Sequence, residues 1–451
     1  MTTAQAVVES LIGHGIDTLY ALPGVHNDHL FDAAQRAQGR FRVLHARHEQ
    51  TSAYMALGAA LVTGRPQVFA TVPGPGLLNA SAAVLTAYGM GAPVITLAGQ
   101  IPSFAIDRGH GHLHEIADQL GLLRHITKYA ARIGAPHEAP ALVAEAVRTA
   151  LSGRTRPVAL ECAIDTWGEV GAVEFPPIAP PAVPPVDAEA VAQAAAILGS
   201  AQRPLVVGGG GALDAGPELL AVAEALEAPV CSFRRGRGAI ATTHRLAVSF
   251  TEGHRYWKDA DAVLAVGTRL YWQLSNWGVD DRLALVRLDI DPEEPARFRR
   301  PACSLVGDAA TVLRALLAEL PARNRDRPRR DAELRAHRAW FEERLARLEP
   351  QMGFLRAIRA ALPDDGIYVE DVTQVGFASR LAFPVYQPRT YLSPGHQDTL
   401  GWSLWRGTRR ASGAAWPQGS CNRRRWRIYV PGARAGDRGP PQVASGSSGV
   451  R

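Results

Sequence analysis

Short apolar runs alternate along the chain with longer stretches of helical periodicity, and turns rich in glycine or proline separate most of them. In the first third of the sequence the strand-like runs are residues 17–22, 43–44, 68–72 and 93–98. Each run leads through a turn toward a helix-like stretch. This alternation is typical of a parallel sheet with helices on both faces. Because ligands bind such sheets beyond the carboxyl ends of the strands, the turns after these runs are the candidate sites.

The same pattern returns in two later parts of the chain. Residues 204–207, 229–232, 262–266 and 285–292 form a second set, and residues 367–374 open a third. We therefore predict an α/β protein with three parallel-sheet domains. The expected division is an N-terminal domain over 1–170, a proline-rich linker over 171–187, a central Rossmann-like domain over 188–325, a connector over 326–350, the start of a C-terminal domain over 351–402 and an aberrant, disordered tail over 403–451.

Composition agrees with more than one domain, because 451 residues exceed one ordinary hydrophobic core. With 47% apolar and 20% charged residues the chain is typical of a soluble globular protein. No apolar run is long enough to span a membrane and no signal-peptide pattern begins the sequence, so we expect a cytoplasmic protein without a membrane partner. The cysteines are scattered, which predicts neither a disulfide framework nor a zinc site.

The net charge of +6 is concentrated at one end of the sequence. Residues 403–451 contain ten arginines and one acidic residue, a charge of +9, and the preceding 402 residues therefore carry −3. Basicity confined to the tail argues against nucleic acid as a partner of the folded domains. A second interpretation makes the tail itself an arm that binds nucleic acid.

Glu49 is the most distinctive polar residue of the N-terminal part. It stands at the start of an alanine-rich helix that has almost no charge from Ala53 onward, so this helix is expected to be buried. A partly desolvated carboxylate at that position is suited to share a proton with a ligand nitrogen. The simpler interpretation is a carboxylate that only complements the helix dipole.

Several other groups belong to the same predicted edge of the sheet. His26, Gln100, His112 and His114 are candidates for substrate contact, and the histidines are equally well explained as ordinary surface residues. In the second domain, glycines 208–211 have the composition of a phosphate cradle. They lack a clean dinucleotide-binding fingerprint, and turn geometry is the simpler reason for them.

Taken together, these stretches resemble the thiamine-diphosphate-dependent decarboxylase and carboligase family, most closely its acetolactate-synthase-like members. The resemblance rests on Arg47–Gln50, on Gly236–Gly238 with Asp289–Pro292, and on the opening of the third block. It implies a pyrimidine-binding domain, a middle domain and a diphosphate-binding domain, with thiamine diphosphate and Mg²⁺ as cofactors. It also implies a small 2-oxo acid as substrate, and a homodimer or tetramer whose sites lie between chains.

The resemblance assigns roles residue by residue. Glu49 matches the glutamate that hydrogen-bonds the aminopyrimidine nitrogen of the cofactor and favours its imino tautomer. Leu400 matches the bulky apolar residue that bends the cofactor. The other residues assigned to cofactor binding are Gly24, Gly74, Gly76, Asp371, Gln374, Gly395 and His396. Asp398 departs from the pattern, because relatives have glycine there and a carboxylate near a diphosphate lowers affinity.

A larger departure concerns the magnesium and diphosphate motif. A Gly-Asp-Gly followed by an asparagine is expected soon after Trp402, and the sequence does not contain it. We therefore predict that this chain has no metal ligands and is inactive. Codons for residues 421–434, read one base later, are able to encode Gly-Asp-Gly. This suggests a frameshift near Trp402 and Ser403 that truncates the third domain.

Two functions of other classes stay open at this point. The chain is also interpretable as a non-catalytic subunit that pairs with an intact relative and lends Glu49 to its partner's site. A third interpretation is a nucleotide-binding regulatory protein that uses Gly208–Gly211. FAD in the middle domain, as in some acetolactate synthases, also stays open, because Arg234, Arg235 and Arg237 fit phosphates and fit plain solvation.

Overall fold

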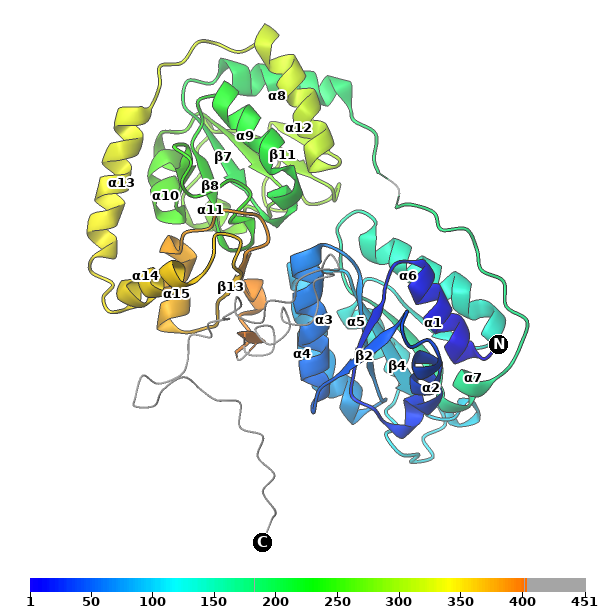
Figure 1. Cartoon of the computed structure of the whole chain (residues 1–451). Helices are drawn as coiled ribbons and strands as arrows, with labels where there is room; N and C mark the ends of the chain where they lie inside the picture. The colour runs from blue at the N-terminus through cyan, green and yellow to red at the C-terminus, as the bar shows by residue number, and fades with distance from the viewer. Residues whose placement is uncertain (182, 401, 404–451) are drawn as a thin grey trace.

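The computed structural model describes residues 1–181, 183–400 and 402–403. They form two six-stranded parallel sheets with helices on both faces and a separate pair of parallel strands (Figure 1). The predicted α/β class is confirmed. The predicted third sheet is not seen in these residues, in which the third block contributes only that pair of strands. The tail expected over 403–451, and with it the frameshift, lies outside the described residues except for Ser403.

The first sheet has the strand order β2-β1-β3-β4-β6-β5. Its strands are β1 (Thr18–Ala21), β2 (Arg42–His45), β3 (Gln67–Thr71), β4 (Val94–Gln100), β5 (Ala130–Ile133) and β6 (Val158–Ala163). Its helices are α1 (Thr3–Gly13), α2 (Asp28–Arg36), α3 (Glu49–Thr63), α4 (Pro75–Met90), α5 (Gln119–Ile126), α6 (Ala139–Leu151) and α7 (Ile164–Gly168). Successive strand residues point to opposite faces. Leu19 and Val68 therefore join the core under α1, α2 and α6, whereas Tyr20 and Phe69 join the core under α3 and α4.

The second sheet has the strand order β12-β11-β10-β7-β8-β9. Its strands are β7 (Pro204–Gly208), β8 (Val230–Ser232), β9 (Ala247–Val248), β10 (Ala262–Val266), β11 (Ala284–Asp289) and β12 (Cys303–Val306). Its helices are α8 (Ala188–Ser200), α9 (Gly216–Ala225), α10 (Phe250–Asp259), α11 (Tyr271–Asn276) and α12 (Ala309–Glu319). Residues 171–181 and 183–187, which join the two sheets, contain neither helix nor strand.

The third block lies between the two larger units (Figure 1, orange). After the connecting helix α13 (Asp331–Leu345), it consists of α14 (Gln351–Ala361), β13 (Tyr368–Val369), α15 (Gln374–Ala382) and β14 (Tyr391–Leu392). Val369, Leu392 and Trp402 pack into the core formed by α3 and α4. Arg237 of the middle domain donates to the carbonyls of Ser379 and Phe383. Within the described residues the block is thus held by contacts with both neighbours, and its own strands are the pair β13 and β14.

An ion pair in the middle domain gives a prediction for acid stability. Glu227 is 8% exposed, and its two oxygens accept from Arg245 Nη1 and Nη2 at 2.6 and 2.7 Å. The hydrogen bonds from Arg245 hold the pKa of Glu227 below its ordinary value. A lowered pKa stabilises the fold above the ordinary carboxyl pKa, and this stabilisation is lost as the pH falls through the folded-state pKa.

Glu227→Gln is therefore expected to lower the free energy of unfolding by about 1.5–3 kcal/mol at pH 7, as for a hydrogen bond to a charged group. The difference from the unmutated chain is expected to shrink once the pH falls below the lowered pKa. Urea unfolding at neutral and at acidic pH measures the free energy of unfolding of the variant and of the unmutated chain. Glu343→Gln, at an exposed pair with Arg347, is the control and should change little. An equal loss for Glu227→Gln at both pH values would contradict the prediction.

Candidate functional site

Glu49 is the first residue of α3, as the sequence predicts. His48 precedes it in an extended conformation, and its Nδ1 accepts the N–H of Gln50 at 3.2 Å. This cap starts the helix immediately after β2, so Glu49 lies at the carboxyl edge of the sheet. Its side chain is half-buried. The alanine-rich body of α3 is largely buried, and the helix ends at Gly64 with φ +69°.

The two oxygens of Glu49 have different surroundings. Oε2 accepts a hydrogen bond from Asn79 Nδ2 of α4 at 3.0 Å. Oε1 faces Gly76, where an added Cβ would lie 3.4 Å away. No hydrogen bond reaches Oε1 from any part of the chain that the structure describes. One oxygen is therefore fixed in place while the other stays available to a ligand nitrogen beside a glycine-lined surface.

The glycines near Glu49 are explained by close packing. A Cβ on Gly24 would lie 2.4 Å from Val72 Cγ1, and a Cβ on Gly76 would lie 2.6 Å from Val72 Cγ2. Gly74 has φ +55° and ψ −116°, and its Cβ would lie 2.3 Å from the carbonyl oxygen of His114. These turns therefore bring the end of β3 against the loop that carries His114. Cofactor contact by the same glycines stays a prediction.

A buried glutamine that sequence reasoning missed holds this turn. Gln119 Nε2 donates to the Gly99 carbonyl at 2.9 Å and to Glu161 Oε2 at 3.0 Å. Its Oε1 accepts from the Gly74 N–H at 3.2 Å. Glu161 is fully buried and is paired with Arg132 Nε at 2.6 Å. No local sequence signal marks Gln119, because its partners belong to three distant turns and strands.

Gln100 belongs to the same buried network. Its Oε1 accepts from the Ile101 N–H at 2.8 Å, and its Nε2 lies 3.5 Å from Glu161 Oε2. The side chain is 2% exposed. Its amide therefore supports the sheet edge in this structure, and its predicted contact with a substrate is untested.

The candidate histidines gather next to the Gly74 turn. The rings of His26 and His114 stack with their centroids 5.1 Å apart. His26 Nε2 lies 3.1 Å from the Leu113 carbonyl, so Nε2 carries the proton and Nδ1 has a free lone pair. Burial, more than the neighbouring His114, lowers the pKa of His26, which is therefore neutral at pH 7. The Nδ1 atoms of both rings are buried and have no hydrogen-bond partner in the described ranges.

His112 lies farther along the same loop. Its ring meets Phe104 edge to face at a centroid distance of 5.8 Å, and its backbone N–H donates to Glu115 Oε2 at 2.8 Å. Backbone hydrogen bonds, chiefly that from His112, keep the pKa of Glu115 low. Glu115 therefore closes this loop as a carboxylate and places His112 beside the exposed Phe104 ring.

The residues assigned to the diphosphate half lie in the third block. Asp371 Oδ1 accepts from the Val372 N–H, and Oδ2 accepts from the Ser403 hydroxyl, both at 2.8 Å. Gln374 Oε1 accepts from Gln351 Nε2 at 2.7 Å. Ser403, the first residue of the predicted tail, is therefore integrated into this block.

The segment from Gly395 to Leu400 follows the second half of α4. Thr399 Oγ1 lies 3.0 Å from Thr86 Oγ1. A Cβ on Gly89 would lie 2.5 Å from His396 Cε1. The Leu400 side chain is 72% exposed. These contacts place the segment beside the carboxyl end of α4.

The predicted pyrimidine half of the site, with Glu49, and the predicted diphosphate half, with His396, therefore lie apart within one chain. Glu49 binds Asn79 near the start of α4, whereas His396 packs on Gly89 near its end. Ten residues of helix separate those two positions, a rise of about 15 Å. Gly76 lies beside Glu49, Gly74 meets the carbonyl of His114, and His114 stacks on His26. The structure does not bring Gly395, His396 or Leu400 to Glu49.

A cluster of arginines lies where the three parts meet. Arg235 is half-buried, and burial together with the neighbouring Arg389, Arg154 and Arg269 lowers its pKa to about 10. Arg269 Nη2 lies 3.0 Å from His396 Nδ1, and Arg154 pairs with the buried Glu294 at 3.0 Å. The cluster is electropositive and faces the Gly208–Gly211 turn.

The glycines of that turn are needed for packing. A Cβ on Gly209 would lie 2.2 Å from the Gly267 carbonyl oxygen, and a Cβ on Gly236 would lie 2.1 Å from the Gly208 carbonyl oxygen. Three loops thus meet backbone to backbone at the carboxyl edge of the second sheet. This supports the interpretation that turn geometry, rather than a phosphate cradle, requires these glycines.

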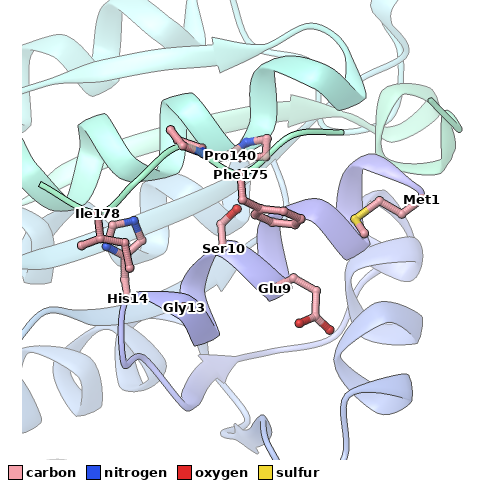
Figure 2. A pocket seen from close by; sticks show the side chains of 9 residues that line it. Met1, Glu9, Ser10, Gly13, His14, Pro140, Phe175 and Ile178 are labelled. Carbon is pink, nitrogen blue, oxygen red and sulfur yellow. The ribbon is translucent and has the colours of Figure 1, made fainter. Parts of the chain in front are cut away.

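A cavity of about 360 Å³ lies away from these groups (Figure 2). Ser10 of α1, Pro140 of α6, and Phe175 and Ile178 of the linker line it. These helices cover the sheet face opposite α3 and α4, so the cavity contains none of the predicted site residues. No group of His, Cys, Asp and Glu able to hold a metal ion occurs within residues 1–181, 183–400 and 402–403. None of the helices in those ranges combines the length and apolarity that crossing a membrane requires.

Comparison with known proteins identifies two stretches of the sequence. Residues 1–122 match the model described as thiamine pyrophosphate enzyme, N-terminal TPP binding domain, and residues 191–316 match that of its central domain. A probable 2-ketoarginine decarboxylase of Pseudomonas aeruginosa is 34% identical over 419 residues, which cover 90% of this chain and 73% of the relative. A probable acetolactate synthase large subunit of Methanocaldococcus jannaschii is 30% identical over 446 residues, which cover 90% of this chain and 72% of the relative. Oxalyl-CoA decarboxylase of Escherichia coli is 30% identical over 331 residues, which cover 70% of this chain and 57% of the relative.

Proposed function

Because the chain belongs to the thiamine pyrophosphate enzyme family, we propose that it is built for thiamine-diphosphate-dependent decarboxylation or carboligation of a 2-oxo acid. The observation that carries the proposal is the state of Glu49. Asn79 fixes one of its carboxylate oxygens, and the other lies free over the Gly76 turn. The relatives include proteins named for a 2-keto acid decarboxylase and an acetolactate synthase, which supports the same class of substrate.

The residues near Glu49 fit the aminopyrimidine half of the cofactor. Thiamine diphosphate, when bound, supplies a carbon nucleophile and an electron sink for the bond next to a carbonyl group. Glu49 Oε1 is placed to share a proton with a ring nitrogen, and Asn79 prevents the carboxylate from rotating away. His26 is neutral, and its Nδ1 is buried without a hydrogen-bond partner in the described ranges, so the ring contributes to the packing of this region and its contact with a substrate stays a prediction. His114, stacked on His26, keeps that ring in place.

We further propose that the Glu49 half and the His396 half of the site meet between two copies of the chain. The separation of the Glu49 end of α4 from the His396 end supports this arrangement. Apolar side chains are exposed along the same region, Leu78 at 49%, Leu85 at 40% and Leu400 at 72%. A second copy, as a homodimer or within a tetramer, would cover them and bring a diphosphate half to each Glu49.

We propose that this chain of 451 residues does not turn over substrate by itself. Its donor set does not fit Mg²⁺, because no acidic cluster of the required kind occurs in the described ranges, and the sequence has no Gly-Asp-Gly motif. The second candidate role, a non-catalytic partner that lends Glu49 to an intact relative, follows from the same geometry. Co-purification with a full-length homologue would favour that role.

A nucleotide or FAD in the middle domain is a separate candidate, supported by the arginine cluster around Arg235. The tightly packed glycine turn next to it counts against a phosphate cradle of the dinucleotide-binding type. Equilibrium dialysis with FAD and with an adenine nucleotide tests it. Retention of either ligand by the unmutated chain, with loss of that ligand on Arg235→Ala, would establish a nucleotide site.

The test of the main proposal is calorimetric titration of the purified chain with thiamine diphosphate, with and without Mg²⁺. We expect weak binding that does not depend on Mg²⁺ and that falls about tenfold or more in Glu49→Gln, because a hydrogen bond to a charged group is lost. Pyruvate is expected to stay unconsumed. The surface variant Glu343→Gln should bind as the unmutated chain does.

Equal affinity of the unmutated chain and Glu49→Gln would refute the assignment of Glu49 to the cofactor. Undetectable binding by the unmutated chain would show that the Glu49 half of the site does not bind thiamine diphosphate without a diphosphate half. Tight binding that requires Mg²⁺, with pyruvate consumed, would overturn the proposed inactivity.

A further inference from the structure

Asp398 bridges two arginines that come from different parts of the chain. Its Oδ1 accepts from Arg380 Nη2 of α15 at 2.8 Å, and its Oδ2 accepts from Arg234 Nη2, in the loop after β8, at 3.0 Å. Each carboxylate oxygen is thus held by one guanidinium. The Arg380 side chain is 6% exposed and that of Arg234 is 22% exposed, so water screens this contact only partly.

The two guanidinium groups are not fully neutralised by other carboxylates. Arg380 Nε also donates to the buried Glu370 at 2.8 Å, so these two charges compensate each other. The other acceptor of Arg234 is the Gly395 carbonyl, and its Nε is buried without a hydrogen-bond partner in the described part of the chain. Arg269 lies on the same side and binds His396. Asp398 is therefore the group that balances the excess positive charge.

The backbone at Asp398 does not need this side chain. Its φ of +45° and ψ of +42° are in the left-handed region, where glycine is preferred and aspartate is tolerated. The Asp398 side chain is 37% exposed, so solvent and solutes reach the carboxylate without unfolding. Asp398 is thus an accessible carboxylate at a position suited to glycine, and two arginines bind it. An anion from solution would meet the same two arginines if the Asp398 side chain were absent.

The chemistry of the pair defines the ligand class. Planar guanidinium groups bind carboxylates and phosphates through the same paired N–H donors. We propose that Arg234 and Arg380 form a binding site for a phosphoryl group and that Asp398 fills this site as an internal anion. The proposal goes beyond the role of Glu49, because it concerns an arginine pair at the other end of α4. The phosphoryl group has two sources, the diphosphate of thiamine diphosphate and a free phosphate compound.

The experiment compares inorganic pyrophosphate binding by four forms of the full chain: unmutated, Asp398→Gly, Asp398→Asn, and Asp398→Gly combined with Arg234→Ala. Asp398→Gly removes the competing charge and suits the backbone, so pyrophosphate should bind about tenfold tighter or more than to the unmutated chain. Asp398→Asn keeps the side-chain volume without the charge and should show a smaller gain. The double variant should lose the gain, because one of the two donors is gone.

Thiamine diphosphate provides the second arm of the experiment. If the cofactor diphosphate uses the site, Asp398→Gly tightens binding of thiamine diphosphate as well as of pyrophosphate. If only pyrophosphate binding improves, the site serves a free phosphate compound. Pyrophosphate binding in Asp398→Gly should not change when Glu49→Gln is added, which separates this test from that of the proposed function.

The proposal is overturned if Asp398→Gly and Asp398→Asn bind pyrophosphate no better than the unmutated chain does. It is also overturned if the double variant keeps the full gain, because the anion would then bind elsewhere. Circular dichroism and thermal unfolding establish that each variant is folded. If Asp398→Gly does not fold, Asp398→Asn with and without Arg234→Ala gives the same comparison.

Discussion

Replacing Arg237 with alanine is expected to lower the free energy of local opening of residues 376–392 by about 2–4 kcal/mol. Arg237 is 6% exposed and donates to the carbonyls of Ser379 and Phe383, at the end of α15. Its guanidinium also lies 4.6 Å from the centre of the Tyr391 ring. Alanine would leave buried carbonyl groups with fewer donors and would remove the cation–π contact. The described part of the third block contains two strands, and contacts such as those of Arg237 hold it against the middle domain.

Hydrogen–deuterium exchange measures this opening for the amides of α15. Exchange in Arg237→Ala should become faster there, while amides of the first sheet keep their rates. Arg235→Ala is the matched control, because its side chain makes no hydrogen bond or ion pair within the described ranges and lies near other arginines. The control should be neutral or slightly stabilising. Unchanged exchange of α15 in Arg237→Ala would show that other contacts hold the block.

Local signals in the sequence correctly predicted much of the fold. Apolar runs followed by turns gave four of the six strands in each sheet but not β5, β6, β9 or β12, and the charge-free stretch after Ala53 gave the buried helix α3. Glu49 was expected at the start of that helix and lies there. These features depend on residues a few positions apart, so periodicity and capping chemistry are sufficient to find them.

Contacts between distant residues were not predictable in this way. Gln119 meets Glu161 across 42 positions, and Arg237 meets Ser379 across 142. No periodicity connects such pairs, and the polar side chains involved look like surface residues until the fold is known. The positions of Glu49 and His396 near opposite ends of α4 were likewise not derivable from local signals, although the family resemblance implied sites between chains.

Asp398 shows how the structure changes the meaning of a residue. From the sequence it is a carboxylate that repels a diphosphate. In the structure Arg234 and Arg380 neutralise it, and the same two groups would attract an anion in its absence. Affinity at this place therefore depends on the competition between an internal and an external anion rather than on repulsion alone.

Replacing Gly74 with alanine is expected to destabilise the N-terminal domain by about 3–5 kcal/mol and to abolish binding of thiamine diphosphate. Gly74 has φ +55° and ψ −116°, a conformation that residues with a Cβ avoid. The added Cβ would also lie 2.3 Å from the His114 carbonyl oxygen, which is backbone and cannot rotate away. Relief of this clash requires the turn to move, which breaks the hydrogen bond from the Gly74 N–H to Gln119. The start of α4, and with it Asn79 beside Glu49, would shift.

Gly109→Ala is the control that isolates the effect of the clash. Gly109 also has a positive φ, +65°, but nothing lies within 4 Å of its added Cβ. This variant should cost only about 1 kcal/mol, the strain of one left-handed residue, and should bind thiamine diphosphate as the unmutated chain does. Urea unfolding gives the stabilities, and calorimetry gives the affinities. If Gly74→Ala and Gly109→Ala lose the same stability and keep the same affinity, the Gly74 turn does not position Glu49, and the link from Gln119 through Gly74 to the candidate site is broken.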